Sequence, residues 1–278
     1  MLRRLSYAGT DGCPLYAFSA DEPSSDATAN RPPLILMHGG GPDHRSLIPL
    51  AKHLSTDAMV VLPDVRGYGR SLCRDPRCHT WRQYADDVVS LLDHLEKPHA
   101  VIGGAGLGTT ISLRTAVVHP DRVSGLVLIS VEDIEDDAGK AAEVAFMDAF
   151  AQRVRTGGVN AGWDPILADL SPIIGTMVHE AMLDADAPSL AAAAAIGHDR
   201  AFHGIDELLG IDVPMLLFAG ADWRHPAGLA RELAKRLPQA RLGTASMSSD
   251  LLTTEDFARA FAPEISDFMR AIPRVRGC

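Results

Sequence analysis

Three glycines at alternate positions mark the stretch of this sequence best placed to do chemistry. Gly104, Gly106 and Gly108 follow the apolar run 100–102, and a helical pattern begins directly after them. A strand, a sharp glycine turn and a helix form a nucleophile elbow, in which a serine normally stands at the centre. Here the central residue is Gly106, which has no side chain to attack a substrate. The sequence therefore predicts the backbone of such a site without its usual nucleophile.

Buried strands and amphipathic helices alternate along most of the chain. We expect strands over 2–7, 15–19, 34–37, 59–62, 100–102, 123–129, 214–219 and 240–244, and helices over 43–54, 81–95, 107–119, 228–237 and 253–271. Thr80 and the pair Thr253 and Asp256 are typical N-terminal caps. The alternation predicts an α/β fold with a mostly parallel twisted sheet and helices on both faces.

Two stretches interrupt this pattern. Residues 20–33 are rich in Pro, Ser and Asp and are expected to form a solvated connection. Residues 132–209 contain acidic residues, prolines and an alanine run, which favours a mostly helical cap over the carboxyl edge of the sheet. We therefore expect an N-terminal part of the core over 1–131, a helical cap over 132–209 and a C-terminal part of the core over 210–278.

Composition excludes some partners. The chain has 278 residues and a formal net charge of -10, which argues against a general binder of nucleic-acid backbones. No stretch approaches the roughly 18 apolar residues of a membrane helix, and the first residues lack the apolar run of a secretory signal. The cysteines Cys13, Cys73, Cys78 and Cys278 have neither zinc-site nor disulfide-framework spacing. We expect a cytoplasmic protein with reduced thiols, no metal and no cofactor.

Four segments, in order and at matching spacing, resemble the α/β-hydrolase fold family over nearly the whole chain. They are LILMHGGGPDHRSL, VVLPDVRGYGRS, VIGGAGLGTTISLRTAVVHPDRVSGLVLIS and VPMLLFAGADW. The resemblance implies an α/β-hydrolase fold with a helical cap insertion. It also implies where a catalytic Ser-His-Asp triad should stand.

By this resemblance all three triad positions are vacated. The nucleophile position holds Gly106. The acid position holds Trp223, with Asp222 one step short, and the histidine position holds Ser249. No histidine follows His225 in the chain. Trp223, Ser249 and the open space at Gly106 are then expected to line a substrate site, and any proton transfer must come from other groups.

The resemblance leaves an oxyanion hole in place. Its two backbone N–H donors would belong to Gly40 and to Leu107 at the head of a helix, where the helix terminus adds positive partial charge. His38 and Gly39 lie in the same loop and are expected at the substrate site, although the family's histidine here is usually a structural hydrogen-bonding group. Glu132 and Asp133 follow the strand 123–129 and are either an acid–base pair or a charged entry to the cap.

These features favour a non-hydrolytic acyltransferase. A substrate thiol is a good nucleophile, so thioester-to-thiol exchange needs no enzyme serine. The expected partners are an acyl carrier (thiolation) protein and a peptide or small thiol. The missing triad and the size resemble the serine-independent indolyl acyltransferase of nosiheptide-type thiopeptide biosynthesis. The alternatives are a catalytically inactive binding protein and a cofactor-free lyase or cyclase acting on a small metabolite.

Other polar groups are expected to be structural. Asp43 and His44 follow the loop glycines and are either an acid–base pair or the solvated start of a helix. Cys73 or Cys78, beside His79, would be a replacement nucleophile only if their loop reached the elbow. The cap histidines His179, His198 and His203 are more typical of surface or core positions.

Overall fold

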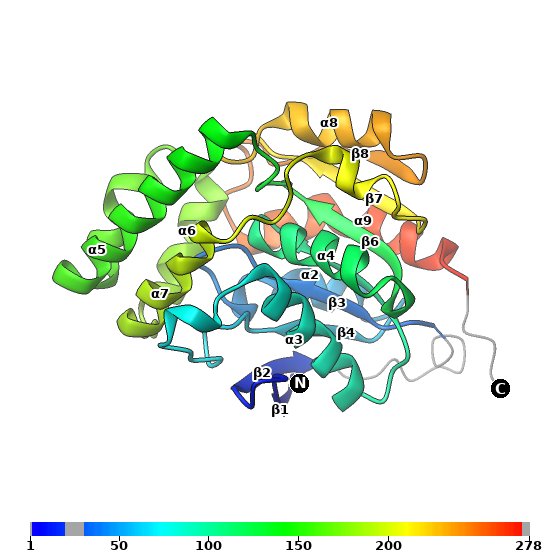
Figure 1. Cartoon of the computed structure of the whole chain (residues 1–278). Helices are drawn as coiled ribbons and strands as arrows, with labels where there is room; N and C mark the ends of the chain where they lie inside the picture. The colour runs from blue at the N-terminus through cyan, green and yellow to red at the C-terminus, as the bar shows by residue number, and fades with distance from the viewer. Residues whose placement is uncertain (1, 20–30, 274–278) are drawn as a thin grey trace.

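The computed structural model describes residues 2–19 and 31–273, which form one eight-stranded sheet with helices on both sides (Figure 1). The strands are β1 Arg3–Ala8, β2 Pro14–Ser19, β3 Leu34–Met37, β4 Val60–Pro63, β5 Ala100–Ala105, β6 Val123–Ile129, β7 Met215–Ala219 and β8 Ala240–Ser246. Their order is β1-β2-β4-β3-β5-β6-β7-β8. The β1–β2 and β2–β4 pairs are antiparallel, and the pairs from β4 onward are parallel. The predicted fold class is confirmed.

The helices outside residues 132–209 begin and end close to the predicted positions. They are α2 Ile48–Leu54, α3 Trp81–His94, α4 Leu107–Val118, α8 Ala227–Arg236 and α9 Thr254–Ala271. The segment 132–209, predicted only as mostly helical, contains α5 Asp137–Leu167, α6 Pro172–Met182 and α7 Ala187–Ala193. Thr80 caps α3 and the Thr253–Asp256 capping box begins α9, as predicted. The helix expected from residue 43 instead starts as a 3-10 turn, because Pro49 stands in the first turn of α2.

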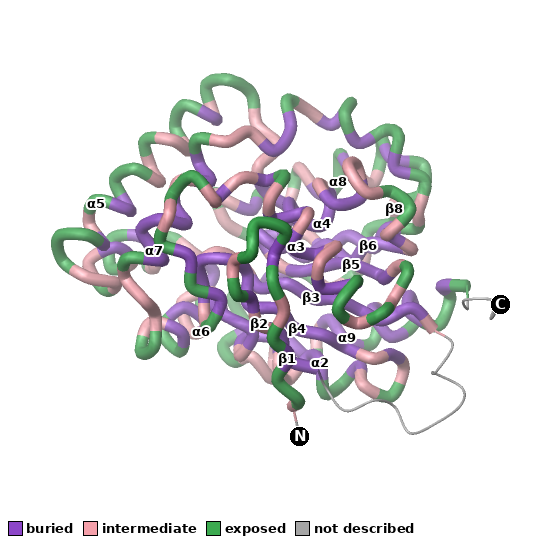
Figure 2. The backbone as a smooth tube through the Cα atoms, turned by 60° about the horizontal axis from the view of Figure 1, so that its bottom comes forward, coloured by how far each residue is buried: buried purple, intermediate pink, exposed green. Residues whose placement is uncertain are grey.

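Alternate strand residues build two cores, one on each face of the sheet. In β3, Ile35 and Met37 join the cluster that includes α3, α4 and α8, whereas Leu34 and Leu36 join the cluster that includes α2 and α9. This alternation follows from the two-residue period of a strand. The central strands are consequently buried on both faces (Figure 2). The sheet is therefore a rigid platform for the loops at its carboxyl edge.

Helices α5, α6 and α7 gather beside one end of the sheet (Figure 1). Helix α5 is broken at Gly158, whose φ of 82° and ψ of -178° only glycine adopts readily. The two arms of α5 pack closely, since a Cβ on Gly162 would lie 2.4 Å from Val154 of the other arm. The break places Phe150 and Trp163 edge to face, with ring centroids 5.0 Å apart.

Parts of the expected organisation lie outside the described residues. These are Cys278 and residues 20–30 of the connection. Among the residues that are described, every helix is too short or too polar to cross a bilayer.

Candidate active site

The elbow keeps its backbone conformation without a nucleophile. Gly106 links β5 to α4 with a φ of 49° and a ψ of -118°, and its N–H donates to the Ile129 carbonyl at 3.0 Å. The glycines two residues before and two residues after Gly106 are also required. A Cβ on Gly104 or Gly108 would lie 2.2 or 2.5 Å from the Met37 carbonyl oxygen. The tight packing of α4 on β3 therefore holds Gly106 at the head of the helix.

A histidine stands over the elbow, contrary to the sequence expectation. A Cβ on Gly106 would lie 3.1 Å from Nε2 of His225. The other ring nitrogen, Nδ1, lies 2.7 Å from Oδ1 of Asp222, which also accepts the His225 backbone N–H. Both residues follow β7, so the acid and the histidine come from one loop. The expectation that no histidine is positioned at this site was wrong.

The reason is local geometry. The family's usual place for the histidine, after the last strand, holds Ser249. The spacing Asp222-x-x-His225 favours a histidine here, since an aspartate readily accepts a backbone N–H shortly downstream and so draws the two side chains together. Ser249 itself is exposed in the loop after β8.

Glu132 is the second polar group over the elbow. Its Oε1 would lie 3.2 Å from a Cβ on Gly106, and its Oε2 lies 3.4 Å from Nε2 of His225. The segment that carries it is strained, because Ser130 and Asp133 have φ values of 62° and 60°. Asp133 is held by Thr110, whose hydroxyl lies 3.0 Å from its Oδ2. Glu132 thus lies over the elbow and Asp133 borders the same cavity, and an acid–base role for either stays a prediction.

Arg224 connects this group to the cap. Its guanidinium lies 2.9 Å from Glu143 of α5 and 3.5 Å from Glu132. Arg224 also lies over the ring of Phe146, 4.8 Å from the centroid. Asp222, His225, Glu132, Arg224 and Glu143 therefore form a chain of alternating charges, which we call the ion cluster.

The ion cluster fixes the charge of His225. Burial by itself would lower the pKa of His225, but the Glu132 carboxylate and the hydrogen bond that His225 donates to Asp222 raise it to about 10. Burial would raise the pKa of Glu132 and of Asp222, yet the imidazolium lowers both. Burial and the nearby Glu132 carboxylate raise the pKa of Asp133. At neutral pH the elbow therefore faces an imidazolium held between two carboxylates.

We expect the His225 ring to remain protonated at pH 8 and to lose its proton near pH 10. The folded pKa lies above the value of 6.5 expected for an unfolded chain. The stability that protonation contributes is thus complete below pH 6.5 and is lost as the pH rises toward 10. NMR titration of the ring nitrogens measures this directly. Glu132→Gln should lower the pKa, and a neutral ring at pH 8 in the wild type would contradict the assignment.

The expected oxyanion donors line the same pocket. Gly40 and Leu107 both border the cavity beside Glu132 and His225. Leu107 is the first residue of α4, where a backbone N–H has no partner within the helix. His38 has a different role. It accepts the Val65 N–H at Nε2 and donates from Nδ1 to the Gly39 carbonyl, so both ring nitrogens are used in holding the loop.

The cavity beside the elbow is aromatic and lies mostly under the cap. It holds about 80 Å³, several times the 10–15 Å³ that one water needs. Its aromatic and large apolar lining residues are Tyr68, Trp81, Phe146, Met147, Phe150, Trp163, Ile166, Leu170, Ile174, Leu190 and Ile196. We call this cavity the aromatic pocket. Most of these residues come from the cap, for which the sequence offered no motif.

Trp223 does not enter the aromatic pocket. Its side chain is 57% exposed and packs edge to face on Phe146, with centroids 5.7 Å apart. It lines a neighbouring groove instead. Trp223 was expected to line the substrate site, but His225 occupies the space beside Gly106 instead. A residue's position in a loop does not determine the direction of its side chain.

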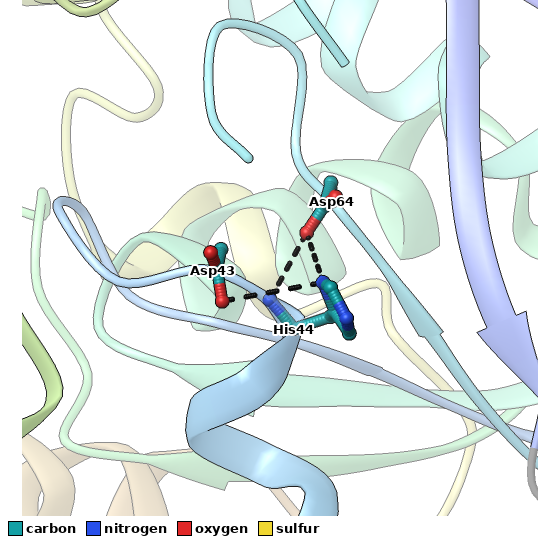
Figure 3. A group of neighbouring side chains, drawn as sticks. All are labelled: Asp43, His44 and Asp64. Carbon is teal, nitrogen blue, oxygen red and sulfur yellow. Dashed lines mark hydrogen bonds and ion pairs between the residues drawn. The ribbon is translucent and has the colours of Figure 1, made fainter. Parts of the chain in front are cut away.

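The remaining candidates lie elsewhere. His44 donates from its backbone N–H and from Nδ1 to Asp64, at 3.0 and 2.7 Å, beside Asp43 (Figure 3). Asp64 also accepts the Arg70 N–H, and Asp43 is bound by Arg45. These hydrogen bonds already occupy the carboxylates, so the group supports the loops around it. The cap histidines, Cys73, Cys78 and His79 do not border the aromatic pocket.

Comparisons with known proteins agree with this architecture. Residues 32–165 match a family described as alpha/beta hydrolase fold. A protein named as a carbamate hydrolase, RutD, from Caulobacter sp. (strain K31) is 30% identical over 240 residues, covering 80% of this chain and 84% of that protein.

Two further proteins resemble the chain. The dihydrolipoyllysine-residue acetyltransferase component of the acetoin cleaving system of Pseudomonas putida is 27% identical over 72% of this chain, a match that spans only 54% of that longer protein. A thermophilic esterase from Thermogutta terrifontis has a TM-score of 0.77 at 23% identity, covering 96% of this chain and 98% of its own. On the sequence matches and the sheet topology, this chain belongs to the alpha/beta hydrolase fold superfamily.

Proposed function

We propose that this protein is a serine-independent acyltransferase that moves an aromatic acyl group from a thioester to a thiol. One observation carries the proposal. Gly106 keeps the elbow conformation but has no nucleophile, while the His225 ring is directed at the space above it. A site of this kind activates a carbonyl and leaves the attack to a second substrate.

The backbone supports the carbonyl chemistry. The thioester oxygen would accept the N–H groups of Gly40 and Leu107, which stabilise the negative charge of a tetrahedral intermediate. Removing triad members from other hydrolases leaves roughly 10³–10⁴-fold catalysis over water from such donors and from binding. Positioning two substrates together contributes further, because it replaces a bimolecular encounter.

His225 supports the sulfur chemistry. An imidazolium lowers the pKa of a nearby thiol, so the acceptor binds as a thiolate and its proton passes to solvent. The acceptor sulfur forms a bond to the carbonyl carbon, and the bond from that carbon to the first sulfur then breaks. The leaving thiolate takes up one proton from solvent, so the reaction consumes none overall. A ring that stays protonated at neutral pH is also a poor general base for water, which disfavours hydrolysis.

The aromatic pocket supports an aromatic acyl group. Edge-to-face contacts with Phe150 and Trp163 suit a flat ring. In this proposal the donor is held as a thioester on an acyl carrier protein, and the acceptor is a peptide cysteine or a small thiol. An indolyl group, as in nosiheptide-type thiopeptide biosynthesis, belongs to this substrate class. The acetyltransferase name of the Pseudomonas putida relative is compatible with the reaction type.

Gly106→Leu should abolish transfer of aryl groups between N-acetylcysteamine thioesters and a thiol acceptor. The added side chain would fill the space above the elbow, where a Cβ alone already lies 3.1 Å from His225. Product formation is followed by mass spectrometry above the uncatalysed rate. Gly175→Leu is the matched control, since that glycine has open space around it. Unchanged transfer in Gly106→Leu would remove the elbow from the mechanism.

A second candidate is proton transfer at the carbon beside a bound carbonyl, as in a cofactor-free lyase or cyclase. The observation in its favour is Glu132, whose Oε1 lies 3.2 Å from the Gly106 Cβ position beside His225. Arylacetyl thioesters incubated in D₂O separate the two reactions. Deuterium at the α-carbon without acyl exchange favours proton transfer. Binding with neither reaction favours a non-catalytic protein.

A further inference from the structure

Tyr68 has a buried hydroxyl group without a hydrogen-bond partner. The residue is only 8% exposed, yet its Oη makes no hydrogen bond to any residue that the structure describes. Most buried polar groups in proteins have such a partner, and the exceptions require an explanation. A hydroxyl group of this kind is available to a molecule bound beside it.

The hydroxyl group lies next to the expected oxyanion hole. Tyr68 borders the aromatic pocket together with Gly40 and Leu107, whose N–H groups are the expected donors. The Oη atom would lie 3.8 Å from a Cβ on Gly40, which is an ordinary van der Waals distance. A carbonyl oxygen that accepts the Gly40 N–H would therefore lie close to this hydroxyl group.

Tyr68 also borders a second, more polar cavity, next to Asp43 and Asp64. The charged groups near the phenol indicate which cavity its hydroxyl group faces. The four that act most strongly on its pKa all border the aromatic pocket, and they are Glu132, Arg224, Asp133 and Glu143. The hydroxyl end of the side chain thus faces the elbow.

The position of Tyr68 is fixed by the loop that carries the oxyanion donor. Its ring packs edge to face on His38, with ring centroids 5.5 Å apart. His38 in turn accepts the Val65 N–H and donates to the Gly39 carbonyl. The Tyr68 N–H donates to the Val65 carbonyl at 2.9 Å. The phenol and the loop containing Gly40 are therefore held in one arrangement before any substrate binds.

The phenol remains a hydrogen-bond donor at neutral pH. Burial and the nearby Glu132 carboxylate raise the pKa of Tyr68 above its usual value of 10. A protonated phenol donates one hydrogen bond. Such a donor accelerates a reaction when it points to an atom on which negative charge develops, because the hydrogen bond is then stronger in the transition state than in the ground state.

We propose that Tyr68 is a catalytic residue that donates a third hydrogen bond to the substrate carbonyl oxygen, beside the N–H groups of Gly40 and Leu107. The inference rests on the proposed function, since the oxygen belongs to the thioester at the elbow. The hydrogen bond strengthens as the acceptor sulfur attacks and negative charge collects on the oxygen. Tyr68 keeps its proton throughout, and the charge leaves with the departing sulfur when the intermediate collapses.

Tyr68→Phe should lower kcat for aryl transfer from an N-acetylcysteamine thioester to a thiol about 10²-fold, the usual effect of removing one oxyanion donor. KM should change little, because the charge is absent from the ground state. The melting temperature should not fall, since Phe keeps the ring that packs on His38 and the hydroxyl group has no partner among the described residues. Tyr16→Phe on β2, away from the aromatic pocket, is the matched control and should leave kcat unchanged.

A second measurement needs no turnover. An aryl methyl ketone with an isotope label at its carbonyl carbon serves as an unreactive analogue of the acyl donor. A hydrogen bond to the carbonyl oxygen lowers the stretching frequency of the bond. The infrared band of the bound ketone should therefore lie at a higher frequency in Tyr68→Phe than in the wild type and in Tyr16→Phe.

The two proposals fail separately. If the wild type transfers acyl groups and Tyr68→Phe keeps its kcat and its ketone band, the third donor is overturned and the acyltransferase stands. If the ketone band shifts in Tyr68→Phe but the wild type transfers nothing, the donor stands and the acyl transfer is wrong. A fall in kcat and melting temperature with an unchanged ketone band would make Tyr68 a structural residue and overturn its catalytic role. A wild type that neither binds the ketone nor transfers acyl groups would overturn both proposals.

Discussion

Gly106→Ser should convert this protein into an ester hydrolase. The serine would stand on the elbow backbone, with its Cβ 3.1 Å from Nε2 of His225, and Asp222 already holds the opposite ring nitrogen at 2.7 Å. The wild type therefore lacks only the nucleophile of a triad whose acid, Asp222, and base, His225, come from one loop. The positive φ of 49° strains any side chain at this position, at a cost of about 1–3 kcal/mol. The variant should therefore fold but be less stable.

The new activity should rise with pH. A serine needs a neutral imidazole to accept its proton, and Glu132 keeps the pKa of His225 at about 10. Hydrolysis of p-nitrophenyl acetate by Gly106→Ser should thus increase up to about pH 10. Adding Glu132→Gln should shift the profile to lower pH. Above pH 8 the rate should exceed that of Gly106→Ala about 10²-fold or more, in line with the loss seen when triad members are removed elsewhere.

Controls separate this gain from contamination. Wild type and Gly106→Ala should neither hydrolyse the ester nor react with a fluorophosphonate probe, and Gly106→Ser should react with both. Gly106→Ser/His225→Asn should lose the new activity. A wild type that reacts strongly with the probe would disprove the absence of a nucleophile. A folded Gly106→Ser that stays inert at pH 10 would show that His225 is not aligned with the elbow.

Arg224→Leu should destabilise the fold by about 3–5 kcal/mol, the usual cost of removing one partner from a buried ion pair. Glu143 would lose its guanidinium while its carboxylate stays largely buried, whereas Glu132 would still pair with His225. A buried carboxylate without a partner disfavours the folded state only while it is charged. The destabilisation should accordingly be largest above pH 6 and diminish as the pH falls and the carboxyl groups take up protons. Urea unfolding at several pH values measures it.

Two comparisons test this explanation. Arg259→Leu removes an exposed ion pair with Glu255 within α9 and should cost less than about 1 kcal/mol. Arg224→Leu/Glu143→Leu also removes the carboxylate that Arg224→Leu leaves without its guanidinium, and it should recover part of the loss. If Arg224→Leu costs no more than Arg259→Leu, the ion cluster does not hold the cap to the core.

The fold was predictable because its signals are local and repeated. Strands such as β3 and β7 are apolar throughout, as burial on both faces requires. Thr80 and Thr253 mark the starts of α3 and α9 without tertiary information. The elbow was recognisable from its glycines, because a side chain at Gly104 or at Gly108 would collide with the Met37 carbonyl oxygen. These features depend on neighbours a few residues away or on the period of a strand.

The site was predictable only where backbone position determines chemistry. Gly40, Leu107, Glu132 and Asp133 border one cavity because strand ends meet at the same sheet edge. Trp223 and His225 are two residues apart in one loop, yet one faces solvent and the other the elbow. That difference follows from the hydrogen bonds of Asp222, which sequence position alone does not reveal. The aromatic pocket forms only when the two arms of α5 pack together, and this tertiary contact is not evident from the local sequence.

The glycine break in α5 also places many of the residues that line the aromatic pocket on a segment separate from the elbow. Phe146 and Phe150 lie on the first arm, and Trp163 and Ile166 on the second, so much of the pocket roof is one hairpin of chain. The first arm of the hairpin contacts the core through the ion pair of Glu143 with Arg224. The second arm contacts the core through Trp163, which lies so close to Gly41 that a Cβ on that glycine would be 2.4 Å from the indole. Exchanging residues 144–167 between relatives should thus change acyl preference while the elbow keeps its geometry.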